Sequence, residues 1–296
     1  MRDLDGDNLL TFRDFERDLH DRSPRTLQSY REAACQLAEH FGGRDLLSLR
    51  KADVLAYLIH VRQTRSPATE LVRYRSLRRF YNWAVAEELI DRSPLYGTEQ
   101  PSVEAREIPV PEADMIRALL KACEGRDHDS VRDTAIIRLF CEPGAPRLAE
   151  MASIRVEHLD MVRDQIAVLG KGAKWRTVPF GAKTGKALTR YLRVRAAHPL
   201  ARLPLLWLGA RGQALTSNGI AQVLRRRCDE AGIKRIHPHQ LRHFAADLWF
   251  GNDGDIQDGM RLFGWESLEM PLRYARANSV KRAIAAHRRK ALGDLL

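Results

Sequence analysis

The chain has 296 residues, of which 44% are hydrophobic, so it can bury sizeable cores, and its length predicts two domains. Its 49 Lys and Arg residues exceed its 38 Asp and Glu residues, for a net charge of +11. The first 100 residues carry 16 basic and 16 acidic side chains, so the whole excess lies after residue 100. A basic domain of this size favours a polyanion partner, usually nucleic acid. A protein with a high pI and no such partner is the alternative.

Composition also argues against several classes of protein. The four cysteines are scattered, without zinc-finger or C-x-x-C spacing, which predicts reduced thiols of an intracellular protein. No apolar run approaches the length of a membrane span. The N-terminal residues are acidic and polar, so we expect no signal peptide.

The first 95 residues show four helical patterns. One covers about residues 10–20, Ser23-Pro24 opens a second, a third surrounds Val54 and Leu58, and Ser66-Pro67 opens a fourth. This predicts an all-α helical bundle over residues 1–95, which we interpret as a core DNA-binding domain. Three arginines, Arg75, Arg78 and Arg79, lie off the apolar stripe of the fourth helix. They could contact DNA phosphates, or could simply form a solvated face.

Prolines and acidic residues mark residues 96–111 as an interdomain linker, followed by a second domain over residues 112–296. Helices are expected at about 112–123 and 129–141, and a turn then leads to a short helix after Arg147. The segments 165–169 and 175–179 flank a Gly-rich turn, which predicts a β-hairpin. The rest of the domain is expected to contain a helix at 182–197, a third short strand at 205–208 and helices at 217–230, 255–263, 267–276 and from 279. Together these elements predict a mainly helical α+β domain with a small antiparallel sheet. The run Arg225–Arg227 is predicted to be solvated or to contact backbone.

One further helix begins at Pro238, a residue suited to a first helical turn because it has no N–H to leave unpaired. Its apolar positions recur at helical spacing from Leu241. His239 and Arg242 are three residues apart and share another face of this helix. A histidine and an arginine side by side at a helix start are suited to holding an anion.

Six residues in order resemble the active-site set of the tyrosine recombinases, also called phage-type integrases. Their contexts are Arg147-Leu148-Ala149-Glu150, Gly170-Lys171-Gly172, His239-Gln240-Leu241-Arg242-His243, Leu262-Phe263-Gly264-Trp265 and Arg273-Tyr274-Ala275-Arg276. The resemblance covers residues 110–276 motif by motif, whereas the N-terminal domain matches only in size and character. The tail at residues 285–290 is similar to actinobacterial phage and plasmid members. Only about ten residues precede the first helix, so we expect the short form without an arm-binding domain.

The resemblance implies a role for each residue. Tyr274 would attack a DNA phosphodiester and form a 3′-phosphotyrosine, while Arg147 and Arg242 stabilise the transition-state charge. Lys171 would protonate the leaving 5′ oxygen, His239 would exchange a proton with the tyrosine, and Trp265 would brace the phosphate. Glu150 and His243 would support the site, and Lys174 and Arg176 would contact DNA. No cofactor, metal or nucleotide is implied.

The resemblance also implies that the partner is double-stranded DNA and that the protein is a monomer when free and a homo-tetramer on DNA. It implies a Holliday junction as intermediate. The implied location is the cytoplasm of a prokaryote, in association with the nucleoid and without membrane attachment. Two departures stand out. The run Gly144-Ala145-Pro146-Arg147 is one residue longer than the usual Gly-x-Arg, and Trp265 stands where many members have His. Integration and excision of DNA is the function that we favour. The rivals are a Xer-like dimer resolvase, a catalytically inactive repressor and a type IB topoisomerase.

Overall fold

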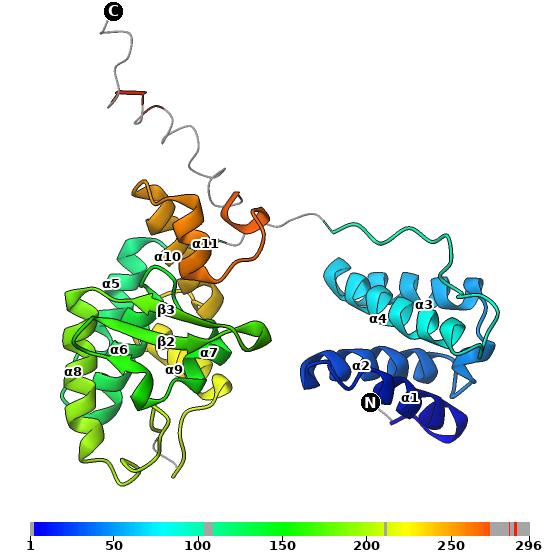
Figure 1. Ribbon diagram of the computed structural model, residues 1–296, viewed down its shortest axis with the longest axis horizontal. Helices are drawn as coiled ribbons and strands as arrows, with labels where there is room; N and C mark the ends of the chain where they lie inside the picture. Colours follow the sequence, from blue (N-terminus) through cyan, green and yellow to red (C-terminus); the bar gives the residue numbers. More distant parts are fainter. Residues whose placement is uncertain (1–2, 104–108, 210–211, 273–283, 285–286, 289–296) are drawn as a thin grey trace, which may run out of the picture. The chain divides into compact units, whose positions relative to one another are not determined.

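The computed structural model describes residues 3–103, 109–209, 212–272, 284 and 287–288, leaving the side chain of Lys171 aside. The chain divides into two compact units, Met1–Arg106 and Glu107–Leu296, and this division falls within the range predicted as a linker. Figure 1 shows the units coloured along the chain.

Over its described residues, 3–103, the first unit is a bundle of four α-helices. They are α1 (Gly6–Asp18), α2 (Pro24–His40), α3 (Lys51–Thr64) and α4 (Pro67–Ala86). Ser23 and Ser66 each accept a hydrogen bond from the backbone N–H three residues on, and a proline follows each serine. These caps fix the starts of α2 and α4, as the two Ser-Pro pairs predicted. The core is rich in aromatic rings, with Phe15 packed edge-on against Phe80 at 5.4 Å between ring centres.

The second unit is mainly helical, with one small sheet. Its helices are α5 (Ala113–Lys121), α6 (His128–Phe140), α7 (Leu148–Ser153), α8 (Ala182–Ala196), α9 (Ser217–Glu230), α10 (Pro238–Gly251) and α11 (Ile256–Phe263). Its strands are β1 (Leu159–Asp160), β2 (Gln165–Leu169) and β3 (Trp175–Pro179), antiparallel in that order. The predicted hairpin therefore forms at the predicted residues. The helices expected at 267–276 and from 279 lie partly or mainly outside the described residues.

The third strand of this sheet is not the one expected. The predicted strand at 205–208 makes only isolated bridges, Arg155 with Leu205 and Leu208 with Ala214. The carbonyl of Leu206 accepts instead from the hydroxyl of Tyr191 and from Nε of Arg195. Because side chains of α8 donate to this carbonyl, residues 206–208 are buried without joining the sheet.

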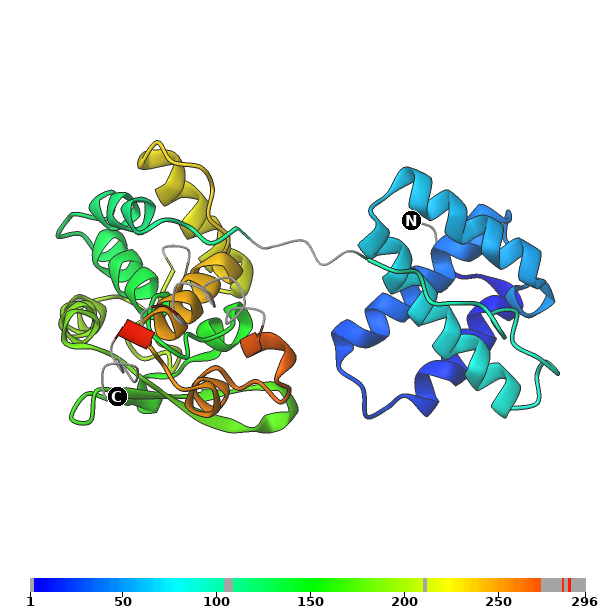
Figure 2. The same ribbon diagram turned by 90° about the horizontal axis from the view of Figure 1, so that it is seen from above.

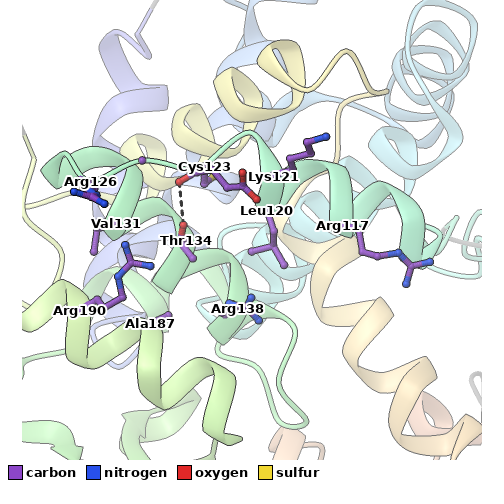
Figure 3. A pocket seen from close by; sticks show the side chains of 12 residues that line it. Arg117, Leu120, Lys121, Cys123, Arg126, Val131, Thr134, Arg138, Ala187 and Arg190 are labelled. Carbon is purple, nitrogen blue, oxygen red and sulfur yellow. Dashed lines mark hydrogen bonds between the residues drawn. The ribbon is translucent and has the colours of Figure 1, made fainter.

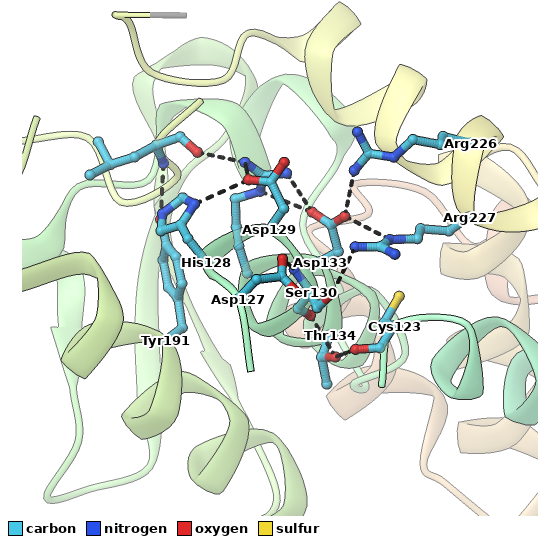
Figure 4. Close-up of polar contacts among 12 residues, drawn as sticks. Cys123, Asp127, His128, Asp129, Ser130, Asp133, Thr134, Tyr191, Arg226 and Arg227 are labelled. Atoms are coloured by element: carbon cyan, nitrogen blue, oxygen red, sulfur yellow. Dashed lines mark hydrogen bonds and ion pairs between the residues drawn. The ribbon is translucent and has the colours of Figure 1, made fainter. Parts of the chain in front are cut away.

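A buried carboxylate holds α6 against α9 (Figure 4). Asp133 is fully buried, and its Oδ2 accepts from Arg226 and Arg227 at 2.8 Å each, while Oδ1 accepts from Arg132. A carboxylate removed from water is tolerated when cations and hydrogen bonds surround it. Arg226 and Arg227 therefore tie α9 to α6. Arg227 is not solvated, because its side chain is 9% exposed, but it does contact backbone, since its Nη1 donates to the carbonyl of Ala122 at 3.0 Å. Arg226 is 47% exposed and remains partly solvated.

A small second core lies under α10 and α11. It consists of Ala145, Ala245, Ala246, Phe250 and Phe263, and the alanines let the neighbouring backbones approach closely. Figures 1 and 2 show α10 and α11 together beside β3, with α8 along another side of the unit. The segment before Arg147 is thus packed directly against these two helices. Helix α10 carries His239, Arg242 and His243, and Trp265 follows the end of α11.

Candidate active site

Arg147 is held at the start of α7. Its backbone N–H donates to Oε2 of Glu150 at 2.8 Å and its Nη1 to Oε1 of the same carboxylate at 2.8 Å. Its Nη2 donates to the carbonyl of Gly264 at 3.1 Å, just after α11. The side chain remains 42% exposed, so part of the guanidinium faces solvent. Arg147 is therefore fixed in direction and still accessible to an anion.

The longer run before Arg147 is accommodated by Gly144. This glycine has φ +82°, a left-handed conformation that side chains disfavour. A Cβ placed there would lie 2.7 Å from the carbonyl oxygen of Leu262. The chain at Gly144 therefore lies against the end of α11, and Arg147 reaches the carbonyl of Gly264.

Arg242 is almost wholly buried in α10, at 4% exposure. Its Nη1 donates to the carbonyl of Ala145 and its Nη2 to that of Phe263, and its guanidinium lies 5.1 Å from the Phe263 ring centre. Burial first, and then the nearby positive charges of Arg176 and Arg147, lower the pKa of Arg242 to about 9. The group remains charged at neutral pH, and it places a buried positive charge behind Arg147.

Among the described residues, Glu150 is the carboxylate that pairs with the arginines of the site, Arg147 and Arg176. It is 5% exposed, and besides Arg147 it accepts from Nη2 of Arg176 at 2.6 Å. Burial raises the pKa of Glu150, but the charge of Arg176 and the bonds from Arg147 outweigh that effect, so the pKa is lowered. The carboxylate therefore stays ionised and offsets part of the repulsion among the arginines.

Trp265 and two histidines lie beside these arginines. The indole of Trp265 stacks on Phe263, with 4.7 Å between ring centres, and on Phe250 at 6.3 Å. The guanidinium of Arg242 lies 6.0 Å from the Trp265 ring centre. His239 is exposed at the start of α10, and its ring packs edge-on at 4.2 Å on that of the buried His243. The predicted bracing and proton-transfer residues are thus on the elements that hold the arginines.

The β2–β3 turn, residues 170–174, also lies against the site. A Cβ on Gly170 would be 3.6 Å from Oε1 of Glu150, and the backbone of Lys171 follows directly in a short 3-10 turn. Lys174 donates from Nζ to Oε1 of Glu266 at 2.6 Å, the residue after Trp265. This bond raises the pKa of Lys174. The predicted nucleophile Tyr274 lies outside the described residues, which end two positions earlier at Leu272 before resuming at residue 284.

Arg176 occupies a different environment from the one its predicted DNA contact required. Its side chain is 10% exposed, and Nη1 donates to the carbonyls of Gly144 at 2.8 Å and Leu262 at 3.0 Å. The alternation of β3 contained this information, because Arg176 shares a strand face with Val178, which is buried. The predicted DNA contact rested on the charge of Arg176 and not on its position in the alternation of the strand. Burial and Arg147 lower the pKa of Arg176, and Glu150 opposes them.

The predicted DNA-contact residues of the first unit lie on one exposed face of α4. Arg75, Arg78 and Arg79 are all exposed. Arg75 donates to the side chain of Gln100 at 3.2 Å, and Arg79 lies 3.6 Å from Asp18. Arg73 of the same helix is instead buried and bonded to Gln36 and Glu32. The three predicted arginines therefore remain available to a surface partner.

A recess of about 770 Å³ lies elsewhere on the second unit, among α5, α6 and α8 (Figure 3). Its lining includes Arg126, Arg138 and Arg190, with the hydroxyl of Thr134 bonded to the carbonyl of Cys123. None of the predicted site residues lines it. Within the described residues, no cluster of three or more His, Cys, Asp or Glu could hold a metal ion, and no helix is long and apolar enough to cross a membrane.

Comparison with solved structures identifies the fold. The structure of the Tn1549 transposon integrase in complex with transposon right-end DNA has a TM-score of 0.77 at 16% identity, covering 96% of this chain and 99% of that one. The post-cleavage complex of XerH site-specific recombinase bound to palindromic difH substrate has a TM-score of 0.73 at 20% identity, with 88% and 79% covered. The chain thus has the fold of the tyrosine recombinases and integrases.

Sequence comparisons give the family. The phage integrase family matches residues 110–280, and the N-terminal SAM-like domain of phage integrases matches residues 11–91. Tyrosine recombinase XerC 1 of Ralstonia nicotianae is 32% identical over 277 residues, covering 86% of this chain and 83% of the relative. Tyrosine recombinase XerD of Listeria monocytogenes is 28% identical over 260 residues, with the same coverage. The chain therefore belongs to the phage integrase family and is a tyrosine-type site-specific DNA recombinase.

Proposed function

We propose that the chain cuts and rejoins DNA strands through a covalent bond between Tyr274 and a 3′ phosphate. The observation that carries this proposal is the meeting of Arg147 and Arg242 at the end of α11, with Trp265 beside them. Tyr274 follows Trp265 by nine positions in the sequence. Two fixed positive charges suit the extra negative charge that forms on the non-bridging phosphate oxygens.

Each group has one task in the proposed reaction. The phenol oxygen of Tyr274 bonds to phosphorus, the bond from phosphorus to the 5′ oxygen breaks, and the phenol proton passes to His239. Lys171 gives a proton to the departing 5′ oxygen. Arg147, exposed on one side, contacts a phosphate oxygen while Glu150 holds its other side. Rejoining reverses these steps, and the phosphodiester energy is conserved in the tyrosine ester.

We further propose that the partner is double-stranded DNA, bound by a homo-tetramer that forms on the DNA from free monomers and passes through a Holliday junction. The exposed arginines of α4 and Lys174 at the β2–β3 turn support phosphate contact. The structural neighbour from Tn1549 is a complex with transposon right-end DNA, and XerH is bound to palindromic difH substrate.

A nicked suicide duplex tests the nucleophile. The wild type should become covalently attached to the cleaved strand, detected as a band shift that survives denaturation, and Tyr274→Phe should give none. The exposed Tyr96, in the linker region, provides the matched control, because Tyr96→Phe should cleave as the wild type does. Adduct formation by Tyr274→Phe would disprove the assignment.

The biological role we propose is integration and excision of a mobile element. Resolution of chromosome or plasmid dimers is the second candidate, since curated relatives that match the chain are named XerC and XerD. Sequencing the genomic DNA trapped by the wild type in its host distinguishes them. Sites at element boundaries support the first role, and one site in a replicon without such an element supports the second.

A further inference from the structure

The same two backbone segments are bridged twice by arginines from different elements. Arg176 of β3 donates to the carbonyls of Gly144 and Leu262. Arg242 of α10 donates to those of Ala145 and Phe263, the next residue in each segment. Two guanidiniums therefore join the segment before α7 to the end of α11 at adjacent positions.

Only one of the two bridging arginines also reaches the carboxylate that orients Arg147. Arg176 donates to Oε2 of Glu150 at 2.6 Å, and Glu150 gives its other oxygen to Nη1 of Arg147. The other end of Arg147 rests on the carbonyl of Gly264, two residues after Leu262. Arg176 thus holds both supports of Arg147, the carboxylate on one side and the end of α11 on the other.

Burying a third arginine here has an electrostatic cost. Burial and the charge of Arg147 disfavour the charged form of Arg176, and Glu150 compensates only in part. Its buried Nε has no hydrogen-bond partner among the described residues. A planar, forked donor satisfies three acceptors in different directions, which a lysine ammonium on a flexible stem does less well.

We propose that Arg176 is a positioning residue, which holds Arg147 in the direction needed for the attacked phosphate and does not itself contact DNA. This inference rests on the proposed function. Misplacing a catalytic group by about 1 Å costs about 100-fold in rate. Losing the clamp should therefore slow cleavage by the folded protein about 100-fold, without changing how tightly DNA binds.

The experiment compares Arg176→Met and Arg176→Lys with the wild type on the suicide duplex, at saturating DNA and with rates corrected for the folded fraction. Arg176→Met should cleave about 100-fold more slowly. Arg176→Lys should be intermediate, because an ammonium can keep the bond to Glu150. The DNA dissociation constant and its salt dependence should match the wild type in both. Should Arg176→Met fail to fold, Arg176→Lys carries the same comparison.

Arg195→Met is the matched control. Arg195 is a buried arginine of the same unit that also donates to backbone carbonyls, those of Ala201, Leu203, Leu205 and Leu206. None of these hydrogen bonds, within the part of the chain that the structure describes, goes to a residue of the site. Its loss should lower stability and leave the cleavage rate of the folded protein unchanged. An equal fall in rate for Arg195→Met would show a general effect of lost stability and overturn the inference.

A double mutant tests whether Arg176 acts through Arg147. With Arg147→Lys already present, adding Arg176→Met should lower the rate by much less than it does in the wild type. Losses that multiply would overturn the inference, as would a normal rate with weaker, less salt-dependent binding, which would mark a DNA contact. If the wild type forms no adduct, the proposed function itself fails; if it does and Arg176→Met cleaves normally, only this inference fails.

Discussion

The two arginines predicted to bind the phosphate differ in how far their charges are buried. Arg147 is partly exposed and Arg242 is buried, although both were predicted to face the same phosphate. Two guanidiniums in similar roles therefore sit in different surroundings. Water screens a buried cation less than an exposed one, so Arg242 can stabilise charge on a phosphate held by Arg147.

At this scale Glu150 gives a pH-dependent prediction. Its folded pKa lies below the ordinary value of 4.5, so its contribution to stability is complete above 4.5 and is lost as the pH falls through the folded value. We expect Glu150→Gln to lower the free energy of unfolding at pH 7 by about 3–5 kcal/mol, because it removes the charge partner of the buried Arg176. The variant should also lose less stability between pH 5 and pH 3 than the wild type.

Urea unfolding at several pH values measures both effects. Glu157→Gln is the control, because the Glu157 side chain is 68% exposed and pairs at the surface with Arg155, its one ionic partner among the described residues. That variant should follow the wild-type pH dependence. A Glu150→Gln profile parallel to the wild type would show that the carboxylate has the same pKa folded and unfolded.

At the scale of elements, the site depends on where α11 ends. Gly264 closes this helix in the left-handed conformation, with φ +60°. A Cβ there would lie 2.9 Å from Cδ and 3.0 Å from Nε of Arg176. The glycine thus both ends the helix and leaves room for the arginine that clamps the site.

Gly264→Ala should therefore be harmful in two ways. The left-handed conformation costs a non-glycine residue about 1–2 kcal/mol, and the new methyl group displaces Arg176. Gly232→Ala separates these effects, because Gly232 has φ +64° after α9 and a Cβ there would meet nothing within 4 Å. Both variants should lose stability in urea unfolding, and only Gly264→Ala should lose cleavage activity. Equal cleavage by the two would contradict the proposed link between the helix end and Arg176.

Local signals predicted the elements well and their partners less well. Ser-Pro pairs, glycine turns and helical periodicity located the helices and the β2–β3 hairpin, because these signals act within a few residues. The expected strand at 205–208 failed because Tyr191 and Arg195, distant in sequence, take its carbonyl of Leu206. The burial of Arg176 follows from the alternation of β3, but its partners Gly144 and Leu262 do not, because no local pattern connects them with β3.

At the scale of the whole molecule, the two parts of the chain differ in charge. The excess of positive charge lies after residue 100, yet the first unit has an exposed arginine face on α4. A neutral unit can still contact phosphates locally while the basic unit supplies the long-range attraction. The exposed arginines of α4, and not the net charge of the first unit, should therefore determine how this unit contributes to DNA binding.

This view predicts how affinity responds to salt. Each phosphate contact that is removed should lower the magnitude of the slope of log affinity against log salt by about 1. We expect Arg75→Gln and Arg78→Gln each to weaken binding and to flatten the slope by about this amount, measured by fluorescence anisotropy on a duplex carrying the recombination site. Arg17→Gln is the matched control, since its side chain is 80% exposed on α1 and belongs to a different helix. If Arg17→Gln flattened the slope equally, binding would reflect total charge; a change confined to the α4 variants assigns the contact to that face.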